Sequence, residues 1–265
     1  MRSINILLPA LFILLGCIPS HPRQGMIKPI TQKQVRHNTE PIARTSSSQD
    51  IIEYEGFTIS YNSRWLIPNW VAYELTAEET DGPYSRKGKD FMIDPAIKVP
   101  QADAYDYRGS GWSRGHMAPA ADLKWSDKAM TESFYYTNIC PQDVQLNNRY
   151  WTTLENKVRS WARLFGRVFV VTGPIVSSSS NERIGAHGVM VPDAFFKAIL
   201  APKEGEWTSI AFVMINTPDP RQLKDCATTV NEVEKITNID FFSFLDDTVE
   251  ESVEDRLDFK EWRVY

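Results

Sequence analysis

One stretch decides how this chain is interpreted: Gly109-Ser110-Gly111-Trp112-Ser113-Arg114-Gly115-His116-Met117-Ala118-Pro119-Ala120-Ala121-Asp122. It holds His116, one of four histidines in the chain, among glycines that free the backbone and beside Arg108 and Arg114. A loop of this kind can direct one imidazole and one guanidinium at a phosphate group. The stretch therefore predicts a candidate catalytic loop.

A long amphipathic helix is predicted further along the chain, over 148–165. Apolar residues recur there at steps of three and four, which is the pattern of one buried stripe: Trp151, Leu154, Val158, Trp161 and Phe165. Asn147 stands at the start of this helix. Glu155 lies two turns further and near the same side, because each i+4 step rotates the position by only about 40°. The helix can therefore present both side chains to the loop around His116.

The remaining segments predict a sheet with few helices. Strands are expected at 57–61, 70–75, 168–173, 194–200 and 207–215, and helices from Ala118 or Pro119, over 126–134 and over 230–237. The segment 168–173 is a continuous apolar run that ends at a Gly-Pro pair, which indicates a buried strand. Few, segregated helices favour the α+β class over a regular βαβ alternation.

The N-terminus resembles an export signal. A short apolar run over 4–15 follows Arg2 and ends in Leu14-Leu15-Gly16-Cys17, which resembles a bacterial lipobox. We therefore expect 1–17 to be a signal peptide and a lipidated Cys17 to anchor the protein to a membrane, facing the periplasm or the cell exterior. A cleaved signal with an incidental Cys17 is the alternative. Residues 18–50 are polar and predict a flexible tether, and 51–265 predict one folded domain.

Composition and cysteine count limit the classes of protein. The formal net charge of -5 argues against a protein that coats nucleic acid, although a local basic cleft can act on an acidic protein. In an exported chain, the remaining Cys140 and Cys226 either form a disulfide or are two separate buried thiols. The sequence has no CxxC motif and no Cys/His cluster, so a metal-thiolate site is not expected.

These polar residues match what the hydrolysis of a phosphodiester requires. A histidine with a near-neutral pKa can take a proton from the attacking water, which makes His116 the candidate base. A divalent cation can neutralise charge on the phosphate and on the leaving oxygen, and Asn147 is a candidate oxygen ligand for it. Arginine can hold non-bridging oxygens with two hydrogen bonds, so Arg114 and Arg108 are candidate phosphate contacts.

Three ordered motifs then match a known family. Segments 113–120, 137–142 and 146–155 read SRGHMAPA, TNICPQ and LNNRYWTTLE. They strongly resemble the sugar-nonspecific DNA/RNA endonucleases, the family of endonuclease G and the Serratia nuclease. The resemblance extends from about Tyr54 to Leu245. It implies an α+β fold with a ββα-metal active site, in which helices pack on a mixed or antiparallel central sheet.

The resemblance also implies a role for each matching residue. His116 aligns with the family's general base, and Asn147 aligns with its direct ligand to Mg²⁺ or Mn²⁺. Glu155 aligns with the acidic residue that orients a water ligand of the metal, Asn138 with an asparagine that supports the site, and Arg114 with the motif arginine. The implied activity is cleavage of DNA and RNA to 5′-phosphate products, with low sequence specificity. A homodimer is left open.

One residue departs from the family pattern. The motif usually begins with Asp, and Ser113 stands at that position. If the residue only shapes the loop, Ser can replace it through a local hydrogen bond. If its charge matters, activity or metal affinity falls. Two alternatives therefore stay open: a catalytically impaired lipoprotein that binds nucleic acid, and a phosphodiesterase with another substrate.

Overall fold

The computed structural model of the protein describes residues 43–45, 50–218 and 221–264. Within these ranges no helix is long and apolar enough to cross a membrane. The predicted signal peptide with Cys17 lies outside the described residues. The tether predicted over 18–50 does not hold for 43–45, because these residues form strand β1 (Ala43–Thr45), which pairs with β13 (Ile239–Phe241).

A seven-stranded sheet lies at the centre of the fold, and every pairing in it is antiparallel. Its order is β12-β11-β10-β7-β4-β3-β2. The strands are β2 (Asp50–Glu53), β3 (Thr58–Asn62), β4 (Ile67–Thr76), β7 (Arg167–Ile175), β10 (Ala194–Lys203), β11 (Glu206–Ile215) and β12 (Ala227–Thr228). The turn between β10 and β11 places Glu204 and Gly205 at φ 51° and 89°, as a two-residue hairpin turn requires.

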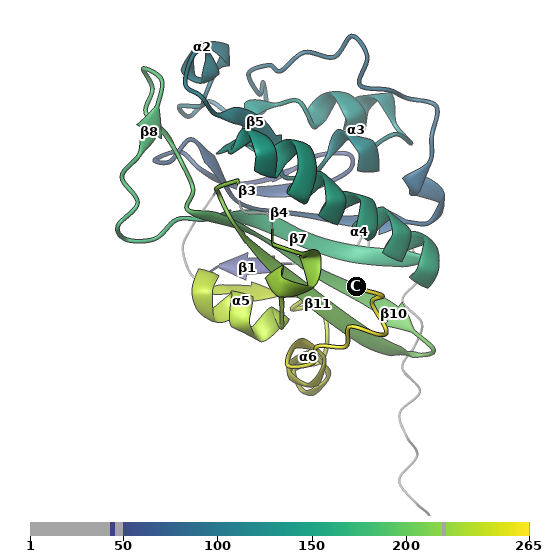
Figure 1. Ribbon diagram of the computed structural model, residues 1–265. Coiled ribbons are helices and arrows are strands. Elements are labelled where there is room, and N and C mark those ends of the chain that lie inside the picture. Colours follow the sequence, from purple (N-terminus) through teal and green to yellow (C-terminus); the bar gives the residue numbers. More distant parts are fainter. Residues whose placement is uncertain (1–42, 46–49, 219–220, 265) are drawn as a thin grey trace, which may run out of the picture.

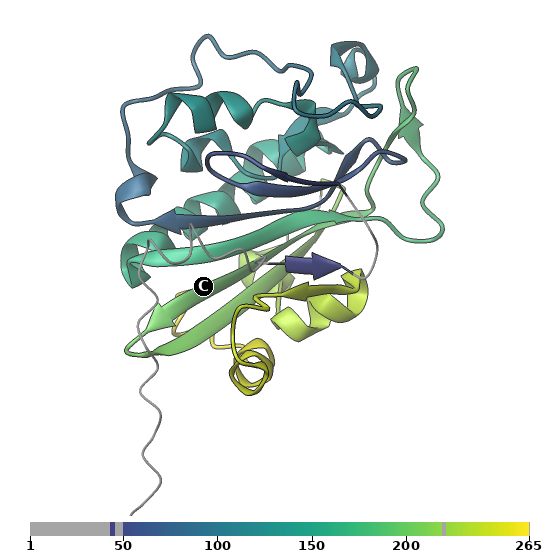
Figure 2. The same ribbon diagram turned by 180° about the vertical axis from the view of Figure 1, so that it is seen from behind.

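Both faces of the sheet are covered. On one face lie α4 (Thr152–Phe165) and α3 (Asp127–Glu132), and on the other lie α5 (Val230–Thr237), α6 (Asp247–Glu254) and the β1–β13 pair (Figures 1 and 2). Alternate residues of β7 enter different cores: Val168 and Val170 pack in one, Phe169 and Val171 in the other. Burial on both faces is the reason that this strand has an uninterrupted apolar sequence.

Two short strands and a helix form a unit on the α4 side of the sheet. β5 (Ser113–His116) pairs antiparallel with β6 (Ile139–Gln142), and a π-helical turn, η4 (Leu146–Trp151), leads into α4. Gly115 allows the close approach of the two strands, since a Cβ there would lie 2.3 Å from Gln142 Oε1. The predicted α+β class is confirmed, with an antiparallel rather than a mixed sheet.

Short elements complete the chain between these parts. They are η1 (Glu78–Thr80), α2 (Ala104–Tyr107), η2 (Ala120–Asp122), η3 (Tyr136–Asn138), β8 (Arg183–Ile184), β9 (Val189–Met190) and η5 (Leu223–Cys226). The helix predicted from Ala118 or Pro119 is only the 3-10 turn η2. The backbone N–H groups of Met117 and Ala118 donate instead to the backbone and side-chain oxygens of Asn138, at 3.0 and 2.9 Å, which keeps this segment out of a helix.

The two cysteines of the domain are not joined by a disulfide. Cys140 lies on β6 and Cys226 at the end of η5, and both residues are buried. Of the two alternatives open from the sequence, the structure has separate buried thiols.

Candidate active site

Four of the six predicted site residues meet around one pocket of about 260 Å³. Arg114 and His116 reach it from β5, Asn147 from η4 and Glu155 from the first turn of α4. Figure 1 shows β5 and the start of α4 side by side above the sheet. The pocket is also lined by Arg86, Pro119, Ala120, Ala121, Lys124, Met130, Asn148 and Thr152.

His116 is held between aromatic rings. The centre of its imidazole lies 5.2 Å from that of Phe91 and 5.1 Å from that of Phe134, which meets it edge-on. Its Nε2 atom is buried and has no hydrogen-bond partner among the described residues. Burial, and then the positive charge of Arg86, lower the pKa of His116 to about 3. The ring is therefore neutral at pH 7, and its pKa lies below the near-neutral value that is best for a general base.

Asn147 and Glu155 supply oxygen atoms from the helical wall of the pocket, which η4 and α4 form. Asn147 lies within the π-helical turn η4, and its backbone carbonyl oxygen accepts a hydrogen bond of 2.7 Å from Thr152 Oγ1. Its side-chain amide is free of that contact. Such turns insert an extra residue into a helix and are frequent at functional sites. An amide oxygen and a carboxylate are hard donors of the kind that Mg²⁺ and Mn²⁺ prefer. The donor set therefore fits a divalent cation.

A buried lysine lies beneath this wall. Lys197 of β10 is fully buried, and its Nζ sits 4.7 Å from the centre of the Trp151 ring with no hydrogen-bond partner in the described structure. Burial lowers the pKa of Lys197, and the charge of Glu155 opposes that shift. Burial also raises the pKa of Glu155, and the charge of Lys197 opposes it in turn. The ammonium group thus favours the ionised form of the carboxyl that faces the pocket.

A buried ion pair lies close to Glu155 and Lys197. The Asp122 carboxylate is buried, accepts a hydrogen bond of 2.9 Å from Tyr73 Oη, and pairs with the guanidinium of Arg159 on α4. The guanidinium of Arg159 is therefore bound to a buried carboxylate and does not extend into solvent.

Asn138 does not line the pocket but fixes the backbone that follows His116. It is buried, its Oδ1 accepts from the Ala118 N–H, and its Nδ2 donates to the carbonyl oxygens of Ala118 and Ser133, each at 2.9 Å. All of these contacts are with backbone groups. Asn138 can therefore position the segment that carries His116, without touching a ligand in the pocket.

The Asn138→Ala substitution is expected to lower the free energy of unfolding by about 2–4 kcal/mol, because it leaves buried backbone groups unpaired. Urea denaturation measures this loss. Asn148→Ala removes an exposed amide and should change stability by less than about 0.5 kcal/mol. If Asn138→Ala abolished activity with an unchanged unfolding midpoint, the positioning role would be wrong.

Arg108 and Ser113 lie beside the pocket, not in it. They line an adjoining hollow of about 460 Å³. Arg86 and Arg114 line both the pocket and this hollow, and so stand between them. Replacing the usual Asp by Ser113 therefore removes no group from the pocket around His116.

One other group of side chains has metal-ligating atoms close together: those of Asp103, Asp106 and His187 lie within 4.8 Å of one another. None of the three lines the pocket. The Asp103 carboxylate caps α2, and the Asp106 carboxylate accepts from the backbone N–H groups of Asp103 and His187 at 2.9 and 3.0 Å. These contacts tie the β8–β9 hairpin to α2, which gives the cluster a structural explanation.

Three residues around the pocket belong to no motif in the sequence: Arg86, Asp122 and Lys197. Arg86 lies in a basic segment that has no motif of its own. Asp122 ends the quoted stretch but carries no visible role until Arg159 and Tyr73 are folded against it. The signal for Lys197 was a single charge within an otherwise apolar strand, and such a charge is almost never fully buried without a partner.

Comparisons with known proteins point to one family. The family model for DNA/RNA non-specific endonucleases matches residues 35–248. "Nuclease EXOG, mitochondrial" of Xenopus laevis is 34% identical over 85% of this chain and 66% of its own length. "Nuclease 1, mitochondrial" of Schizosaccharomyces pombe is 38% identical over 71% of this chain and 64% of its own length.

A solved structure, that of a complex of EndoG with EndoGI, is similar with a TM-score of 0.71 and 29% identity. The match covers 77% of the present chain and 89% of the matched chain in that complex. For the mitochondrial relatives from Xenopus laevis and Schizosaccharomyces pombe, the aligned region spans less than two thirds of their own length.

These relatives correct the predicted location. An exported lipoprotein anchored through Cys17 is contradicted, because the similar nucleases are named as mitochondrial proteins. An apolar run behind one basic residue is a weak signal, since targeting segments for different membranes share positive charge and apolar residues.

Proposed function

Because the chain belongs to the DNA/RNA non-specific endonuclease family, we propose that it is a metal-dependent endonuclease that hydrolyses phosphodiester bonds in DNA and RNA and leaves 5′-phosphates. One observation carries this proposal: a neutral histidine, an arginine and two oxygen donors converge on one pocket. The activity of the whole protein is part of the proposal, since its relatives extend beyond the aligned region.

In this proposal, each residue of the pocket has one task. His116 takes a proton from the attacking water through its neutral imidazole. Arg114 binds the non-bridging oxygens of the phosphate. Asn147 would bind a divalent cation directly and Glu155 would orient one of its water ligands, and the bound cation would stabilise charge on the phosphate and on the leaving oxygen. The P–O3′ bond breaks, so the phosphate stays on the 5′ carbon.

The experiment that tests this function uses the purified full-length chain with plasmid DNA and with RNA. We expect both to be cut in Mg²⁺ or Mn²⁺, and neither in EDTA, because EDTA removes the cation that is proposed to stabilise charge on the leaving oxygen. Gel electrophoresis follows the products, and 5′-end labelling reports the phosphate. If plasmid and RNA stayed intact at high enzyme concentration with either metal, the endonuclease proposal would fail.

The second candidate is a protein that binds nucleic acid without cutting it. Ser113 is the observation that favours it, because the family motif usually has an acid there. Against it, Ser113 lines the adjoining hollow and the pocket around His116 keeps every proposed group. Binding in EDTA with no cleavage in either metal would select this candidate. A homodimer remains a prediction.

A further inference from the structure

The hollow beside the pocket is rich in unpaired positive charge. Arg86, Arg108 and Arg114 line it, and none of its lining residues is acidic. All three arginines are exposed. Within the described ranges, none of the three guanidinium groups has an ion-pair or hydrogen-bond partner, although the protein as a whole has a net charge of -5.

Aromatic rings hold the guanidinium groups in place instead. The Cζ atom of Arg114 lies 4.6 Å from the centre of the Phe91 ring, and that of Arg108 lies 4.9 Å from the centre of the Tyr105 ring. A guanidinium over a ring keeps its N–H groups available for hydrogen bonds in its own plane. Such groups are suited to an anion with several acceptor oxygens, and phosphate has that chemistry.

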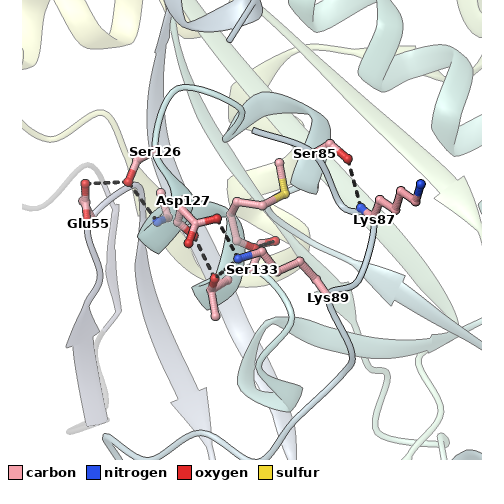
Figure 3. A network of polar contacts seen from close by, with 10 residues as sticks. Glu55, Ser85, Lys87, Lys89, Ser126, Asp127 and Ser133 are labelled. Atoms are coloured by element: carbon pink, nitrogen blue, oxygen red, sulfur yellow. Dashed lines mark hydrogen bonds and ion pairs between the residues drawn. The ribbon is translucent and has the colours of Figure 1, made fainter. Parts of the chain in front are cut away.

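The backbone segments that carry these arginines are anchored separately. Figure 3 shows Lys89, from the loop that holds Arg86, reaching α3, where its Nζ donates to Asp127 Oδ1 and Thr131 Oγ1 at 2.7 Å each. Arg108 follows α2, which His187 ties to the β8–β9 hairpin through Asp106. Arg114 lies on β5, which pairs with β6. The positive charges therefore sit on three anchored segments, which reduces the cost of ordering them around a ligand.

The position of the hollow defines its ligand. It shares Arg86 and Arg114 with the pocket around His116, so an anion in the hollow lies next to one in the pocket. In a nucleic acid the group next to one phosphodiester is the next phosphodiester of the same strand. The volume of about 460 Å³ is in the range of small-molecule sites and leaves room for a nucleotide.

We infer that this hollow is a second phosphate subsite, which binds the phosphodiester adjacent to the one being cut, with Arg108 as its characteristic contact. This inference rests on the proposed function and deepens it: the substrate is a strand with at least two consecutive phosphates. An acid at position 113 would stand among the three guanidinium groups and weaken the subsite. Ser113 leaves the charge of the hollow uncompensated.

Binding is measured first, in EDTA, by fluorescence anisotropy with a labelled single-stranded oligonucleotide. Arg108→Gln and Ser113→Asp should each weaken binding about tenfold, since each removes or opposes a charged hydrogen bond to phosphate. Arg108→Gln should also reduce the slope of log binding constant against log salt concentration by about the amount that one phosphate contact contributes. Arg163→Gln is the matched control, because it removes one exposed charge about 12 Å along α4 from Glu155. It should change the affinity less than about twofold.

Cleavage is measured next, with two substrates in Mg²⁺. Arg108→Gln should lower kcat/KM for the oligonucleotide about tenfold and leave that for a dinucleoside monophosphate unchanged, because the latter has a single phosphodiester. Equal losses on both substrates, or unchanged binding in EDTA, would overturn the subsite. If no variant or wild-type protein cut either substrate, the proposed function would fail, and selective loss of binding in Arg108→Gln would still support the subsite.

Discussion

His116→Ala should lower the rate of DNA and RNA cleavage by about 10²–10⁴-fold, the range that a positioned general base contributes. Among the residues that line the pocket, no other imidazole can replace His116. The other ionisable lining groups are Arg86, Arg114, Lys124 and Glu155. The measurement is initial cleavage rate at saturating Mg²⁺, with oligonucleotide binding in EDTA as the control for an intact site. Added imidazole should restore part of the rate, because it can enter the space that the side chain leaves.

The low pKa of His116 gives this prediction an independent check in stability. The folded state holds the ring neutral down to about pH 3, whereas an unfolded histidine takes up a proton near pH 6.5. Stability from this residue is therefore present above about pH 6.5 and is lost as the pH falls below it, because protons bind the unfolded state more strongly. When the pH is lowered from about 7.5 to about 5, the melting temperature of His116→Ala should therefore fall less than that of the wild type. Equal losses would contradict a neutral His116 ring in the folded state.

Asn147→Ala should lower cleavage by about 10–100-fold or more and raise the Mg²⁺ concentration needed for half-maximal activity, since it removes a proposed oxygen ligand. The fold should be retained, because the hydrogen bonds of this residue are made by its backbone: its N–H donates to the Asp143 carbonyl and its own carbonyl accepts from Thr152 Oγ1. Mg²⁺ titration of activity and circular dichroism measure the two effects.

Asn148→Ala is the matched control for this second prediction. Asn148 is the next residue in η4 and also lines the pocket, but it is not a proposed ligand. Its loss should shift the Mg²⁺ requirement less than about threefold, in the range of weak surface effects. If both variants shifted it equally, general polarity of the wall rather than ligation by Asn147 would explain the result.

The elements that the sequence predicts well are those whose burial is uniform along one face. Helix α5 is found at 230–237 as expected, and the apolar stripe of α4 packs into the core through Leu154, Val158 and Trp161. The sequence shows the helical period of their apolar residues because one face of each helix packs against the sheet. Trp151, which the stripe places in the core, is buried.

The elements that differ depend on contacts between distant segments. Asn138 diverts the chain after His116 from a helix, across 20 residues of sequence. The sequence of residues 43–45 resembles that of the polar tether, and these residues form a strand because they pair with β13. Local propensity is a weak prior when a distant partner supplies backbone hydrogen bonds.

The sequence by itself determined the family and the α+β class, and it predicted the site residues His116, Arg114, Asn147 and Glu155, because motif spacing and helical period are local properties of the chain. Only the tertiary structure decided which charges stand around them. Lys197 comes from a central strand, Arg86 from a loop tied to α3, and Arg108 from the end of α2. Electrostatic interactions depend on distance through space and on burial. For that reason the neutral His116, the charge beneath Glu155 and the cationic hollow appear only once the chain is folded.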